Sequence, residues 1–163
     1  MKTRFLHSLC TVAVMISVLV GGCSKAPDDS AAATAGHGHE HKAPHGGTAV
    51  VLGDEAYHLE FVHNPESGTL TAYVLDAHME NFVRTNAASF EVIAQVGDEA
   101  RPLTFRAAAN TATGETVGDT AQFDAPADWL KSTPHFEASL KSLTIRGRTF
   151  SDVKFTFPGA AHP

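Results

Sequence analysis

The sequence predicts an all-β domain: an antiparallel β-sandwich of the immunoglobulin-like type with about seven or eight strands and one short helix, or alternatively a small β-barrel. Two observations carry this prediction. Short runs rich in Val, Thr, Leu and aromatic residues recur from residue 48 onward, and clusters of Gly, Asp, Asn and Pro separate them. A length of 163 residues with 18% charged side chains suits one folded domain plus a tail.

Three runs open the domain and predict a meander. Thr48–Leu52 is rich in β-branched residues and ends at turn formers. Ala56–His63 alternates between two faces, which places His58 and Glu60 on the same side of the strand. After a loop of turn-forming residues, Thr69–Leu75 supplies the third strand.

The β pattern continues to the end of the domain. Further strands are expected at Ser89–Gly97, Pro102–Ala107 and Gln122–Phe123, and in a final hairpin of Phe136–Ile145 with Arg148–Phe157. Residues 110–120 form a long polar loop. Asp124–Lys131 is expected to form one or two helical turns that begin at Pro126, so that Trp129 and Leu130 close one end of the core.

The N-terminal 23 residues have the layout of an export signal. Lys2 and Arg4 precede a short apolar run that ends in Gly21-Gly22-Cys23. Val20-Gly21-Gly22-Cys23 resembles the lipobox of bacterial lipoproteins, with Val where Leu is commoner. The resemblance implies that acyl chains such as palmitate are attached to Cys23, and several chains anchor a protein stably in a membrane. A soluble secreted protein or an uncleaved anchor is the alternative.

The predicted boundaries follow from this signal. Residues 1–22 are the signal peptide, 23–47 a flexible tether, 48–158 the β-domain and 159–163 a tail. In a Gram-negative host, Ser24 after the lipobox cysteine implies the periplasmic face of the outer membrane. Without Lys2 and Arg4 the chain keeps 10 basic residues against 18 acidic ones, so nucleic acid is not an expected partner.

The tether carries a short histidine-rich tract. His37, His39 and His41 alternate with small or polar residues. Neutral imidazoles on a flexible backbone can bind Cu²⁺, Zn²⁺ or Ni²⁺, although ordering the tether reduces the affinity. A polar spacer that happens to carry histidine is the alternative interpretation.

The domain adds a second set of candidate metal ligands. Closing the predicted turns places His58 opposite Val50 and Val74. This register predicts two groups, with Glu60 within reach of either. The first is His45 with His63, and the second is His58 with Asp76, His78 and Met79. His and carboxylate ligands favour Zn²⁺ or Ni²⁺, whereas a Met ligand favours Cu(I). Taken singly, His63 suits a surface or loop-capping role, Met79 a core role, and His58 with Glu60 equally a solvated pair.

The sequence therefore predicts a lipid-anchored periplasmic protein that binds or delivers a transition metal, in partnership with a metal-efflux or other envelope protein. No nucleophile elbow, phosphate loop or zinc-protease helix is found, so an enzyme is not expected. A metal-independent, immunoglobulin-like interaction or structural module is the alternative. The segments His45–Gly47, Tyr57–Glu60, Tyr73–Asp76 and Ile145–Phe150 resemble a group of small bacterial exported proteins with a His-rich N-terminus, which implies a periplasmic metal-handling role.

Overall fold

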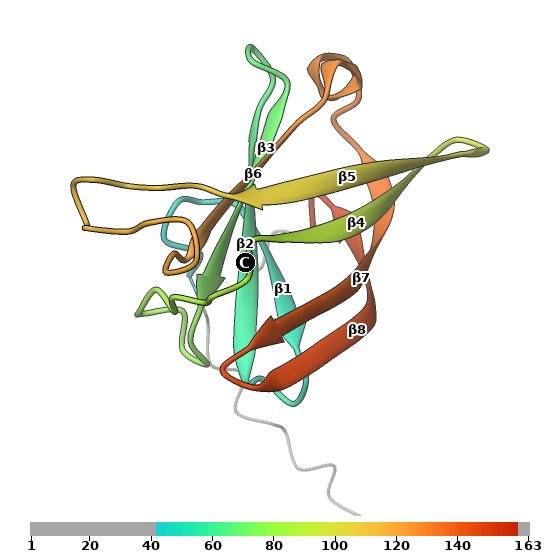
Figure 1. Cartoon of the computed structure of the whole chain (residues 1–163). Coiled ribbons are helices and arrows are strands. Elements are labelled where there is room, and N and C mark those ends of the chain that lie inside the picture. Colours follow the sequence, from blue (N-terminus) through green and yellow to red (C-terminus); the bar gives the residue numbers. More distant parts are fainter. Residues whose placement is uncertain (1–41, 160–163) are drawn as a thin grey trace, which may run out of the picture. The chain divides into compact units, whose positions relative to one another are not determined.

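The computed structural model describes residues 42–159. They form eight strands in one sheet, ordered β1-β2-β3-β6-β5-β4-β7-β8, in which every neighbouring pair is antiparallel (Figure 1). The strands are β1 (Thr48–Leu52), β2 (Tyr57–Asn64), β3 (Thr69–Leu75), β4 (Ser89–Val96), β5 (Glu99–Ala107), β6 (Gln122–Pro126), β7 (Phe136–Ile145) and β8 (Arg148–Phe157). The predicted all-β antiparallel class is confirmed.

The sheet curls until its two outer strands nearly meet. β4 and β5 cross over the direction of β2 and β3, and β8 returns toward β1 (Figure 1). Just beyond β8, the backbone N–H of Gly159 donates a hydrogen bond of 3.0 Å to the Thr48 hydroxyl at the start of β1. Of the two predicted architectures, this nearly closed single sheet corresponds to the small β-barrel.

Aromatic rings make up much of the core inside the sheet. Phe61 on β2, Phe105 on β5 and Phe123 on β6 are fully buried. Phe61 stacks on Phe155 of β8 with ring centroids 4.8 Å apart and meets Phe105 edge-on at 5.5 Å. These contacts join strands from different parts of the sheet through its interior, and such ring pairs add to the stabilisation from burial alone.

The register of the meander differs by one residue from the expected one. His58 lies opposite Val51 on β1 and Leu75 on β3, where Val50 and Val74 were expected. Each of the two connecting turns contains four residues, which puts the hairpin centre between two residues instead of on one. The strand ranges were predicted well, but turn length decides which residues face each other.

A single turn of 3-10 helix, η1 (Asp128–Lys131), closes one end of the core. Leu130 is fully buried and Trp129 packs edge-on against Phe136, as expected. The predicted helix start at Pro126 is wrong, because Pro126 is the last residue of β6 and Ala127 caps η1. Among residues 42–159, no helix has the length and apolar character needed to cross a membrane.

Candidate functional site

A buried carboxylate on β2 holds the segment that leads into the domain. Glu60 is fully buried although it lies on the outer face of the strand. Its Oε1 accepts hydrogen bonds from the backbone N–H groups of His45, at 2.7 Å, and Gly47, at 2.9 Å, and its Oε2 accepts one from the His45 ring Nδ1 at 2.8 Å. The interpretation of Glu60 and His58 as a solvated pair is wrong, because residues packed on this face cover both side chains.

The His45 ring is held in one orientation from two sides. It stacks on the Tyr73 ring with centroids 4.1 Å apart and planes 18° apart, and Phe82 lies tilted at 5.7 Å. Because a carboxylate only accepts hydrogen bonds, the proton lies on Nδ1, and Nε2 of the neutral ring carries a lone pair directed away from Glu60. The His45 side chain is 38% exposed and borders a surface pocket, so a ligand can reach the ring.

Two glycines shape the segment around His45. Gly46 has a φ of 69° and donates to the Ala43 carbonyl at 3.0 Å, a left-handed turn that glycine adopts without steric cost. Gly47 lies so close to β2 that a Cβ there would collide with the Phe61 carbonyl oxygen and lie 2.9 Å from the Glu60 Cγ. The His-Gly-Gly sequence therefore lets the backbone N–H groups reach the carboxylate.

The loop after β3 is organised by Asp76. Its carboxylate accepts hydrogen bonds from the Asn81 side-chain amide, at 2.7 Å, and from the backbone N–H groups of Glu80, at 3.0 Å, and Asn81, at 3.3 Å. The Asn81 side chain, more than any other group, lowers the pKa of the Asp76 carboxyl. The Asp76 carboxylate therefore uses its oxygens to hold the loop of residues 76–81.

The second predicted ligand group does not assemble around Asp76. His58 is 2% exposed and its Nδ1 donates to the Asp76 backbone carbonyl at 3.2 Å, not to its carboxylate. Met79 is 3% exposed, which agrees with the core role considered for it, and its φ of 57° reverses the loop. His78 is exposed on the same loop.

The first predicted pair is also not formed. His63 lies on the other face of β2 from Glu60, where its Nε2 donates to the Leu130 carbonyl at 3.0 Å and its ring meets Phe157 edge-on. Its role is to cap the turn at η1. The expectation that His45 would meet His63 is wrong, because the turn at Gly46 directs the His45 ring to Glu60 instead.

Four predicted site residues lie outside the described residues. They are the lipidation site Cys23 and the tether histidines His37, His39 and His41. Their roles stay predictions. Within residues 42–159, no three side chains of His, Cys, Asp or Glu are grouped so that they could hold a metal ion.

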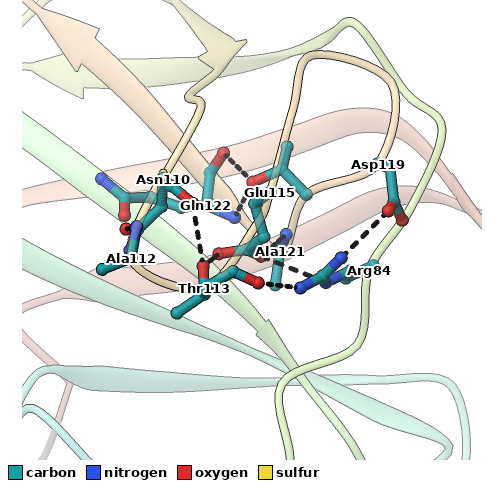
Figure 2. A network of polar contacts seen from close by, with 9 residues as sticks. Arg84, Asn110, Ala112, Thr113, Glu115, Asp119, Ala121 and Gln122 are labelled. Atoms are coloured by element: carbon teal, nitrogen blue, oxygen red, sulfur yellow. Dashed lines mark hydrogen bonds and ion pairs between the residues drawn. The ribbon is translucent and has the colours of Figure 1, made fainter.

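A second polar cluster lies between the 76–88 connection and the 110–120 loop (Figure 2). The Arg84 guanidinium donates to the Asp119 carboxylate, at 3.0 Å, and to the Thr113 carbonyl, and its Nε lies 3.9 Å from Glu115. Glu115 is 8% exposed and also accepts hydrogen bonds from the Ala121 backbone N–H, at 2.8 Å, and the Thr113 hydroxyl, at 2.6 Å. These contacts order a loop that the sequence presents only as long and polar.

A pocket of about 520 Å³ separates this cluster from the His45 ring. Its lining includes the rings of His45, Tyr73 and Phe82 and the amide side chains of Asn110 and Gln122, and Gln122 lies beside Tyr73 as its partner across β3 and β6. Its volume falls within the range of small-molecule sites, about 300–1,000 Å³. It opens on the outer face of β3 and β6, away from the core.

Carboxylates make the surroundings of this pocket electronegative. Burial raises the pKa of the Tyr73 hydroxyl, and the negative charges of Asp124, Glu60 and Glu115 raise it further. A cation approaching the His45 ring is therefore favoured over an anion.

The sequence pointed to His45 and its partner Glu60 but not to the other residues that line the pocket. Tyr73 could have been placed beside Glu60, since the two lie opposite each other on β2 and β3. Arg84 and Glu115 carry no local signal, because an isolated ion pair between two loops has no characteristic spacing. Comparison of the chain with protein-family models, curated proteins and solved structures gives no match.

Proposed function

We propose that this chain is a lipid-anchored protein of the bacterial envelope that binds a transition metal, with His45 as the ligand that the folded domain contributes. The observation that carries the proposal is the His45–Glu60 pair. Histidines that bind metals commonly donate their second ring N–H to a carboxylate, which fixes the tautomer and raises the basicity of the other nitrogen. The fully buried Glu60 occupies that position relative to Nδ1 of His45.

One imidazole does not hold a metal ion by itself, so other ligands are needed. The sequence offers them at short range, because His41, His39 and His37 precede His45 by four, six and eight residues. A histidine set suits Zn²⁺, Cu²⁺ and Ni²⁺. The electronegative surroundings of Tyr73 favour any of these cations.

Anchoring through Cys23 is the second part of the proposal. An acylated Cys23 would hold the domain at a membrane by a tether of about twenty residues, at the periplasmic face of the outer membrane in a Gram-negative cell. A metal bound at that position is accessible to a soluble or membrane-bound acceptor. The protein that receives the metal would be a metal-efflux protein or another envelope protein.

The experiment is a calorimetric titration of the whole chain in detergent with Zn²⁺, Cu²⁺ and Ni²⁺. Three variants are compared: His45→Ala, the triple change of His37, His39 and His41 to Ala, and His135→Ala as an exposed control. We expect the first two to weaken the tightest site about tenfold or more, and the control to leave it unchanged. Binding also raises the melting temperature if the native state holds the ion.

Two other results of the titration would contradict the proposal or part of it. Unchanged affinity in His45→Ala would leave the tether as the binder and remove the domain from the site. Absence of any tight site would favour the second candidate, a metal-independent interaction module.

A further inference from the structure

We infer that the pocket between the His45 ring and the 110–120 loop binds a neutral saccharide. The inference goes beyond metal binding: it shares the His45 ring with the proposed metal site, but it depends on the residues that line the pocket and not on the histidine tract. Its first element is an aromatic surface. Phe82 is 50% exposed and lies tilted against both Tyr73, at 5.9 Å, and His45, at 5.7 Å. The apolar C–H face of a sugar ring packs on such a surface.

The second element is a set of hydrogen-bonding groups in the lining of the same pocket that have no strong partner within the protein. Within the described part of the chain, the Asn110 Nδ2 and Gln122 Oε1 have no protein partner, because the Asn110 Oδ1 caps its own loop and the Gln122 Nε2 makes only a long contact of 3.4 Å to Asp124. The Tyr73 hydroxyl likewise has no hydrogen bond to residues 42–159. The pocket therefore offers both donors and acceptors, as a polyhydroxylated ligand requires.

The third element is the charge balance of the walls. Arg84 is paired with Asp119 and Glu115, and Glu115 accepts two further hydrogen bonds (Figure 2). His45 is paired with Glu60. No cation in the lining is left to bind an anionic group, and no carboxylate in the lining is left to bind an organic cation. An uncharged ligand needs no counter-charge from these walls, whereas an organic cation would gain only the longer-range attraction of carboxylates that are already paired.

The volume of the pocket can accommodate a ligand of one or two sugar units. A volume of about 520 Å³ exceeds that of a single monosaccharide ring. The ligand could be a free sugar or the end of a longer glycan, since both present the same ring. In a free sugar and in a glycan end, the group that enters the pocket is a sugar ring.

The test is saturation-transfer NMR on the whole chain, in a detergent without a sugar head group and with a chelator present. The probes are glucose, N-acetylglucosamine and its β-1,4-linked dimer, with glucuronate and glucosamine as charged counterparts. We expect a dissociation constant of about 1 mM for the neutral sugars, which is ordinary for ligands of this size. Tighter binding of the dimer would assign the site to a glycan chain, and equal binding to a free sugar.

Two variants separate the pocket from nonspecific contact. Phe82→Ala and Gln122→Ala should each weaken sugar binding about tenfold or more, while Val117→Ala, an exposed control outside the lining, should not. Absence of binding to every neutral probe, or preference for a charged probe, would overturn the inference. Both variants keep His45 and the tether. If they lose sugar binding but keep the wild-type metal affinity, the sugar site and the metal site are tested separately.

Discussion

Two substitutions of Glu60 distinguish the stabilisation that comes from its negative charge from the stabilisation that comes from its hydrogen bonds to the backbone. In Glu60→Gln, the amide oxygen at the Oε1 position keeps the two backbone hydrogen bonds from His45 and Gly47. The amide N–H₂ at the Oε2 position then faces the Nδ1 of His45, which must give up its proton to accept. In Glu60→Ala, all three hydrogen bonds are lost.

The expected destabilisation follows from the number and kind of hydrogen bonds. A bond to a charged acceptor contributes about 1.5–3 kcal/mol, but losses at one site are not additive, and water reaches the half-exposed His45. We therefore expect the free energy of unfolding to fall by about 1–2 kcal/mol in Glu60→Gln and about 3–4 kcal/mol in Glu60→Ala. For a domain of this size, about 4 °C of melting temperature corresponds to each kcal/mol.

The assay is urea unfolding followed by far-ultraviolet circular dichroism, with thermal unfolding as a second measure. Glu137→Gln is the matched control, because Glu137 is exposed on β7, and its effect should stay within about 0.5 kcal/mol. If both Glu60 variants matched this control, Glu60 would not hold the 45–47 segment. If Gln and Ala were equally damaging, the charge alone would matter and the backbone hydrogen bonds would not.

Three further predictions test other parts of the account. Gly47→Ala should destabilise the domain by about 2–3 kcal/mol in the same unfolding assay and weaken metal binding, because the added Cβ would collide with β2; a wild-type value would show that the segment can shift freely. Asp76→Asn should destabilise the domain at neutral pH, and the difference should shrink as pH falls, because the lowered pKa of Asp76 means that its ionised form stabilises the fold above the ordinary pKa of a carboxyl and loses this effect on protonation; a pH-independent difference would refute this. Leu130→Ala should lower the free energy of unfolding by about 2–5 kcal/mol in urea, since Leu130 is the fully buried residue of η1, and a loss below about 1 kcal/mol would mean that η1 does not close the core.

Strand positions could be predicted from the sequence because alternation and turn residues are local signals. Thr48–Leu52, Thr69–Leu75 and the hairpin around Arg146 and Gly147 have the bounds that the pattern indicated. The order of strands in the sheet could not be predicted in this way. The pairing of β3 with β6 and of β4 with β7 joins segments far apart in the chain, and only their packing decides it.

The candidate site was predictable in part for the same reason. His45 and Glu60 were named by residue type, but extending the strand register beyond Thr48 placed His45 near His63, and the turn at Gly46, which directs His45 to Glu60, was not predicted. The burial of Glu60 on an outer strand face also had no local signal. Residues 45–47 and the loop beginning at Asp76 cover that face. Neither segment is a strand, so the alternation of apolar and polar residues gives no information about them.

The most direct measurement of the central claim is a long-range ¹H–¹⁵N NMR spectrum of the His45 imidazole, recorded on the whole chain before and after addition of Zn²⁺. We expect the neutral His45 ring of the metal-free protein to carry its proton on Nδ1 and not on Nε2, because the Glu60 carboxylate accepts from Nδ1. Zinc should then shift the Nε2 resonance and leave Nδ1 protonated. A neutral ring that carries its proton on Nε2 in place of Nδ1, or an Nε2 resonance that zinc does not change, would contradict the assignment of His45 as the metal ligand of the domain.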